Sequence, residues 1–234
     1  MDYISSGVRE AIFMILRLDK EFIGIVWVSI RLSSTSILLA SLAGCPLGVA
    51  LLHGNFRGKQ ILLDIINTLM ALPTVVVGLF LYALLSRRGP LGSWGLLYTL
   101  SGIVMGQFLL ALPIVTGLTI SAVHGLDDRV KSTALSLGAN RWQSFSTLIR
   151  ESRPAVLAAI MAGFGRVFAE VGVSMMIGGN IRGYTRTITT AIALETSKGE
   201  FALGIALGIV LLAVAFTVNV FLARFKRRIK RERL

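Results

Sequence analysis

The sequence predicts an all-α membrane protein of about five transmembrane helices, and three observations carry that prediction. Of its 234 residues, 54% are hydrophobic, and the mean hydropathy is +0.76. The apolar residues gather in blocks of roughly 20 or more, the length at which a helix crosses a bilayer. One long polar interval, residues 127–154, separates two blocks, and its apolar residues recur at helical spacing. We therefore expect one transmembrane domain over residues 1–234, with an amphipathic segment of one or two short helices outside the bilayer.

The expected elements follow one another along the chain in a simple order. An amphipathic stretch over residues 5–18 is too short and too charged to span, so we expect it at the membrane interface. The five spans that we predict after it cover residues 25–52, 61–85, 96–123, 155–177 and 201–223. The long polar interval joins the third span to the fourth, with Gly138 near the joint of its helices. A second polar connector, residues 178–200, joins the fourth span to the fifth.

Three of the predicted spans contain a proline, namely Pro46, Pro73 and Pro113. Each proline removes a backbone donor and kinks or breaks its helix. Such breaks persist in a membrane only where neighbouring protein or a cavity satisfies the freed carbonyls. Static kinks that help packing are one interpretation, and hinged helices around a pathway are the other. Three such spans of five favour the hinged interpretation, and Pro73 and Pro113 are our pathway candidates.

The fourth predicted span carries two charged residues, Arg166 and Glu170, four positions apart on one helix face. Charges at this depth are costly and usually face protein or water. They form either a structural ion pair or a pair that lines or gates a pathway, and the sequence leaves both open. The same span has small residues at helical spacing, a pattern that lets another helix approach closely. These residues are Ala158, Ala162, Gly165, Ala169 and Gly172.

The connector over residues 178–200 mixes basic, amide and hydroxyl side chains. Such side chains suit the binding of an oxyanion or of an acidic protein surface. A solvated loop with a short helix is the other interpretation. The candidates for docking or for anion binding are Asn180, Arg182, Thr185, Arg186 and Thr187.

The distribution of basic residues predicts the orientation of the chain in the membrane. Residues 224–234 hold seven Lys or Arg, which places the C-terminus in the cytoplasm under the positive-inside rule. Counting back over five spans places the long polar interval inside and the N-terminus and the second connector outside. The inner segments then hold fourteen Lys or Arg and the outer segments eight. The net charge of +12 therefore reflects membrane orientation, and we expect no nucleic-acid partner.

Motifs for catalysis and for nucleotide binding are absent from the sequence. It has no GxxxxGK[ST] phosphate loop, no HExxH and no GxSxG, and its single cysteine, Cys45, has no metal-ligand spacing. We therefore expect a chain that is not an enzyme and that binds neither a metal nor a cofactor.

The long polar interval resembles the EAA loop of ABC importer permeases. The match consists of Ser132-Thr133-Ala134, then Gly138 and Ala139 followed by Trp142, with Ser and Thr where the family has Glu and Ala. The resemblance implies a type I permease core in which residues 127–153 form a cytoplasmic coupling helix that docks on a separate ATPase. The residues that it implies for coupling are Ala134, Gly138, Ala139 and Trp142.

Within that family, three further segments resemble the tungstate and molybdate oxyanion branch: residues 71–78, 165–172 and 180–188. This resemblance implies import of tungstate or molybdate by alternating access across the cell inner membrane. It also implies a homodimer, two ATPase copies that hold ATP-Mg, and a periplasmic or lipid-anchored substrate-binding protein. A permease for another anion such as sulfate is one alternative. The other is a self-contained secondary transporter or channel with Arg166 and Glu170 as its charged site.

Overall fold

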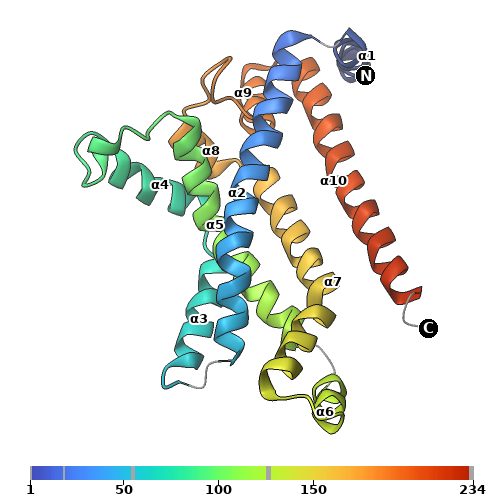
Figure 1. Cartoon of the computed structure of the whole chain (residues 1–234). Coiled ribbons are helices and arrows are strands. Elements are labelled where there is room, and N and C mark those ends of the chain that lie inside the picture. The colour runs from blue at the N-terminus through green and yellow to red at the C-terminus, as the bar shows by residue number, and fades with distance from the viewer. Residues whose placement is uncertain (1, 18, 54–55, 125–127, 232–234) are drawn as a thin grey trace.

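The structure is a computed structural model that describes residues 2–17, 19–53, 56–124 and 128–231. Three long helices form its centre: α2 (Lys20–His53), α5 (Leu100–His124) and α7 (Arg141–Phe168) (Figure 1). Helix α2 packs closely on α5, because a Cβ added at Gly48 would lie 2.9 Å from the Thr116 carbonyl oxygen. The glycine thus lets two backbones approach, as small residues do in membrane helix pairs.

A fourth long helix, α10 (Phe201–Arg231), runs along one side of this centre, and α1 (Asp2–Arg17) packs against it (Figure 1). An apolar cluster at the start of α10 joins it to α2, α7 and α9 (Ile188–Lys198), with Ile188, Ala206 and Leu207 fully buried. A second cluster, around Ala111 and Val115 of α5, joins α5 to α2 and α7. Helices α2 and α7 therefore take part in both apolar clusters.

Two bent pairs of helices complete the membrane-spanning part. Helix α3 (Lys59–Met70) meets α4 (Thr74–Leu85) at 97°, and α7 meets α8 (Gly172–Gly178) at 56°. By length and composition, three described helices could cross a membrane, or up to five if each bent pair is one span. That each pair crosses as one span stays a prediction.

The four prolines that lie in or near these helices differ in their effect. Pro73 lies between α3 and α4, with φ −62° and ψ 122°, and its carbonyl accepts the first backbone hydrogen bonds of α4. The residue before a proline avoids helical backbone angles, so α3 ends ahead of it. Pro46, Pro113 and Pro154 lie inside the continuous helices α2, α5 and α7. The break that we predicted at Pro113 is therefore absent, because α5 continues through it. The break that we predicted at Pro73 is present, and the two helices on either side of it meet at nearly a right angle.

The segments that connect the helices gather at two opposite ends (Figure 1). One end holds α1, α9 and the short 3-10 helix Gly92–Trp94. The other end holds the end of α2, the start of α3 and the short helix α6 (Asp128–Ser136). The predicted membrane topology, including which end faces the cytoplasm, stays a prediction.

Helix α7 begins at Arg141, well before residue 155, where we placed the start of the fourth span. The second half of the polar interval and the predicted span as far as Phe168 are therefore one helix, which passes through Pro154. A continuous helix thus links the exposed beginning of α7 to Arg166.

Candidate functional site

The first candidate site is the connection between α6 and α7, residues 137–140, which we call the α6–α7 turn. Gly138 has φ +83°, its N–H donates to the Leu135 carbonyl at 3.0 Å, and the Ala139 N–H donates to the Ala134 carbonyl at 3.0 Å. This pair of bonds closes a Schellman motif, in which glycine takes the left-handed position after the helix. Gly138 lies at the joint of two helices, as the sequence predicts, but the second of them, α7, is long.

The other side of the turn is fixed by Asn140. Its Oδ1 accepts a hydrogen bond from the Gln143 backbone N–H at 2.8 Å, and Gln143 Oε1 accepts one from the Asn140 N–H at 2.9 Å. The two bonds form a capping box at the start of α7. The turn is therefore bounded by a capped helix end on each side.

The α6–α7 turn presents apolar side chains to solvent. The side chains of Leu137 and Trp142 are 83% and 75% exposed, and Leu135 is also exposed. The Trp142 ring contacts Phe145, with the ring centroids 5.7 Å apart. Ala134 and Ala139 are half-buried beside them. Large exposed apolar groups at a rigid protrusion are typical of an interaction surface.

Sequence reasoning missed Leu137 as a site residue, although an apolar residue beside a helix-ending glycine is a local signal for it. The same reasoning predicted Ala134, Gly138, Ala139 and Trp142, which lie at or next to the α6–α7 turn, and their role in coupling stays a prediction. Asp127, where the predicted coupling segment begins, lies outside the described residues.

The second candidate site is a groove where the two bent pairs meet α5. It is narrow: a water-sized sphere has only about 10 Å³ of room in it, and the empty space of about 290 Å³ around that room includes open solvent. The residues that line it are Leu69, Met70, Leu72, Thr74, Leu110, Ile114, Arg166, Val167 and Glu170. The predicted pathway residues thus converge: Arg166 and Glu170 line the groove, and Pro73 and Pro113 are each adjacent to residues that line it.

Arg166 and Glu170 differ greatly in exposure. The Arg166 side chain is 52% exposed and the Glu170 side chain 2%, and their nearest charged atoms lie 4.0 Å apart. Glu170 Oε1 accepts a hydrogen bond from the Val173 N–H at 3.0 Å. Its backbone carbonyl accepts another from Thr189 Oγ1 at 2.7 Å. Glu170 is therefore held at the bend between α7 and α8, whereas Arg166 reaches into the groove.

Helices α4 and α8 pack tightly beside this groove. A Cβ added at Gly172 would lie 3.0 Å from the Val75 backbone nitrogen, so Gly172 allows the close approach that its sequence pattern predicts. The rest of the small-residue stripe differs. Ala162, Gly165 and Ala169 are exposed, and a Cβ added at Gly165 would meet no heavy atom within 4 Å. That part of the stripe is therefore exposed in the described part of the chain.

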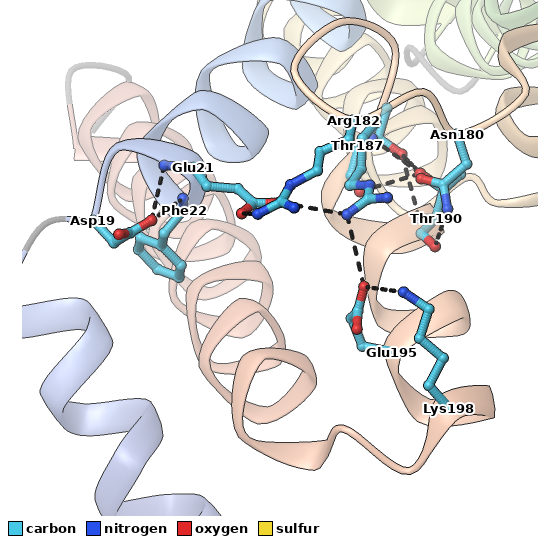
Figure 2. A network of polar contacts seen from close by, with 10 residues as sticks. Asp19, Glu21, Phe22, Asn180, Arg182, Thr187, Thr190, Glu195 and Lys198 are labelled. Carbon is cyan, nitrogen blue, oxygen red and sulfur yellow. Dashed lines mark hydrogen bonds and ion pairs between the residues drawn. The ribbon is translucent and has the colours of Figure 1, made fainter.

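The third candidate site, the connector over residues 178–200, holds a network of ion pairs (Figure 2). Arg182 pairs with both carboxylate oxygens of Glu21, and its Nε lies 2.7 Å from Oε1. The hydrogen bond to Glu21 raises the pKa of Arg182 further above its ordinary value. Arg186, which is buried, lies 3.5 Å from Glu21 and 3.6 Å from Glu195. Glu195 also pairs with Lys198 at 3.3 Å.

The polar uncharged candidates of the connector hold its backbone. Thr185 Oγ1 donates to the Gly178 carbonyl at 2.6 Å and accepts from the Ile181 N–H. Thr187 forms a capping box with Thr190 at the start of α9, and Asn180 Nδ2 donates to the Thr190 carbonyl at 3.3 Å. All these partners belong to this chain, and a role in docking or anion binding stays a prediction for the whole set. Sequence reasoning missed Glu21 because it lies far from the connector along the chain.

Comparison with known proteins assigns this architecture to a family. The sequence profile of the family described as binding-protein-dependent transport system inner membrane component matches residues 36–231. A tungstate uptake system permease protein, TupB of Campylobacter jejuni, is 44% identical and covers 97% of this chain and 95% of its own length. A second TupB, from Peptoclostridium acidaminophilum, is 38% identical and covers 94% of this chain and 96% of its own. The molybdenum transport permease ModB of Escherichia coli is 29% identical over 89% of this chain and 94% of its own.

Solved structures show the same fold. An inward-facing structure of the methionine ABC transporter MetNI has a TM-score of 0.71 at 15% identity, covering 88% of this chain and 95% of that one. A bacterial alginate ABC transporter in complex with a pentasaccharide-bound periplasmic protein has a TM-score of 0.67 at 19% identity, covering 93% and 82%. The chain therefore belongs to the family of binding-protein-dependent transport system inner membrane components, and it is a multi-pass permease subunit of an ABC importer.

Proposed function

We propose that this permease imports tungstate, with molybdate as the nearest alternative substrate. The observation that carries the proposal is the similarity to two tungstate uptake permeases at 44% and 38% identity over nearly the whole chain. The molybdenum permease of Escherichia coli is 29% identical, and a sulfate permease, CysT, is 30% identical over 75% of this chain. The order of these similarities favours tungstate over molybdate and sulfate.

The α6–α7 turn is the proposed docking site for the ATPase. Its exposed Leu137 and Trp142 form an apolar knob, and the two caps fix the knob in one conformation. A preformed surface loses little conformational entropy when it binds. Because α7 is continuous from the turn to Arg166, docking and movement of the ATPase would shift the groove directly. ATP-Mg would be bound and hydrolysed on that separate subunit.

A homodimer is proposed from the exposed stripe on α7. Ala162, Gly165 and Ala169 share their exposed face with Arg166, whose charge would be costly against lipid. A second copy packed on this face would cover the small residues and enclose Arg166 between subunits. The dimer would then bind two ATPase copies, one on each α6–α7 turn.

Transport would proceed by alternating access around the two bent pairs. The end that holds α1 and α9 would face outward and receive the oxyanion from a periplasmic or lipid-anchored binding protein. The C-terminus and the α6–α7 turn would face the cytoplasm. ATP binding needs only to favour one of two conformations through a difference in ATPase affinity. The bends between α3 and α4 and between α7 and α8 supply points at which the two conformations can differ.

The test is uptake by proteoliposomes that contain the permease, the ATPase and the binding protein encoded beside it. With ATP-Mg inside, radiolabelled tungstate should accumulate, excess molybdate should compete, and excess sulfate should leave the rate unchanged. Omission of the ATPase or of the binding protein should abolish uptake. Accumulation of sulfate in place of tungstate would contradict the substrate, and accumulation without ATPase would indicate a self-contained transporter.

A further inference from the structure

Arg166 is a cation that lines the groove where the two bent helix pairs meet α5. Of the described residues that line the groove, it alone carries a positive charge. Its side chain is half exposed although it lies on α7 between the second apolar cluster and the bend to α8. An arginine is expensive at such a depth unless it meets protein, water or an anion. Its five donors in a planar fork match the oxygens of a tetrahedral oxyanion.

Glu170 is the partner of Arg166 within the chain, but the pair is loose. A separation of 4.0 Å is longer than an N–H···O hydrogen bond. Glu170 Oε1 is already engaged by the Val173 N–H, and the carboxylate is almost fully buried. The carboxylate therefore has a fixed place, and the guanidinium is the movable member of the pair.

The pair also lies at the junction of both bent helix pairs. The groove that it lines includes Leu72 and Thr74, on either side of Pro73, and Glu170 itself lies in the bend from α7 to α8. Any change in these two bends alters the room around Arg166. The position is thus suited to a group that binds a substrate in one conformation and releases it in another.

From these contacts we propose that Arg166 binds the oxyanion in the translocation pathway and that Glu170 competes with the oxyanion for it. The inference rests on the proposed function as an oxyanion importer. While the groove is empty, the Glu170 carboxylate attracts the guanidinium. A dianion that enters the groove takes its place, because two negative charges attract the guanidinium more strongly than one. The competition keeps binding weak enough for the anion to leave.

The experiment measures binding of radiolabelled tungstate to the detergent-solubilised permease–ATPase complex by equilibrium dialysis, without binding protein. Arg166→Gln should weaken binding by about tenfold or more, since a charge-assisted contact is lost. Glu170→Gln should strengthen binding, because the competing charge is removed while the amide oxygen still accepts the Val173 N–H. Arg166→Lys should retain part of the affinity. Arg31→Gln, an exposed arginine on α2 away from the groove, should match the wild type.

The opposite changes in tungstate affinity expected of Arg166→Gln and Glu170→Gln distinguish substrate binding from a structural ion pair. A structural pair is broken equally by either substitution, so Arg166→Gln and Glu170→Gln would change tungstate binding in the same direction, and that result overturns the inference. Equal affinities in all variants overturn it as well. Uptake by wild-type proteoliposomes of the same preparation is measured in parallel. Loss of tungstate uptake there contradicts the proposed substrate, whereas normal uptake with unchanged variant binding contradicts the inference alone.

Discussion

Gly138 is the residue on which the shape of the α6–α7 turn depends. Its φ of +83° is left-handed, whereas a Cβ added there would meet no heavy atom within 4 Å. Glycine is therefore required for its backbone conformation and not for space. A residue with a side chain would adopt this left-handed conformation at a cost of about 1–2 kcal/mol. Gly138→Ala should shift the turn away from the docking conformation and weaken ATPase binding by about fivefold or more. Titration of the solubilised permease with labelled ATPase measures this change.

Gly199 provides a matched control for that substitution. It ends α9 with φ +82°, it too has open space around an added Cβ, and α9 lies at the opposite end of the molecule from α6 (Figure 1). Gly199→Ala should therefore cost similar strain and leave ATPase affinity unchanged. Equal losses of ATPase affinity in both variants would show that strain alone, rather than the docking turn, explains the result.

At this scale the sequence predicts those features that depend on neighbouring residues. Gly138 can be recognised from the sequence because a Schellman motif involves only a few consecutive residues. The ion pairs of Arg182 and Arg186 are different, since their partner Glu21 lies more than 150 positions earlier. Only the packing of α2 beside the connector brings that carboxylate near, and a single sequence carries no local signal of it.

Among the elements, the bend between α3 and α4 depends on Pro73. Pro73→Ala should restore a backbone donor and let α3 continue toward α4. Spin labels at the exposed positions Ile61 and Phe80 report this, in a background where Cys45, the single cysteine, is alanine. A straight helix would separate these positions by about 28 Å, against about 18 Å for a right-angle bend. Distances from electron–electron double resonance should therefore lengthen or broaden in the variant, and tungstate uptake should fall.

Pro46→Ala is the control at the element scale, because Pro46 lies inside the continuous helix α2. It should leave both the measured distance and uptake unchanged. If Pro73→Ala also leaves the distance unchanged, packing of α4 on α8 through Gly172 sets the bend, and the proline is incidental.

Element boundaries were less predictable than the existence of the elements. Hydropathy locates α2, α5 and α10 because each is long and apolar. It misplaces the start of α7, since the helix continues from an amphipathic segment into an apolar one and passes through Pro154. The amino-acid composition changes from amphipathic to apolar within α7, whereas the helical backbone continues without a break. The same signal treats Pro73 and Pro113 alike, although the first lies between two helices and the second lies inside a continuous helix.

For the whole molecule, the exposed stripe on α7 predicts the oligomeric state. A leucine at Gly165 would project from the face that we propose to be covered by a second copy, and it would hold the two helices apart. Gly165→Leu should therefore convert the permease from two copies per complex to one, as measured by light scattering in detergent. Gly208→Leu is the matched control, because Gly208 is a helical glycine on α10 with open space around an added Cβ. A Gly165→Leu permease that remains a dimer would show that the subunit interface lies elsewhere. Another part of the complex would then have to separate the Arg166 side chain from lipid.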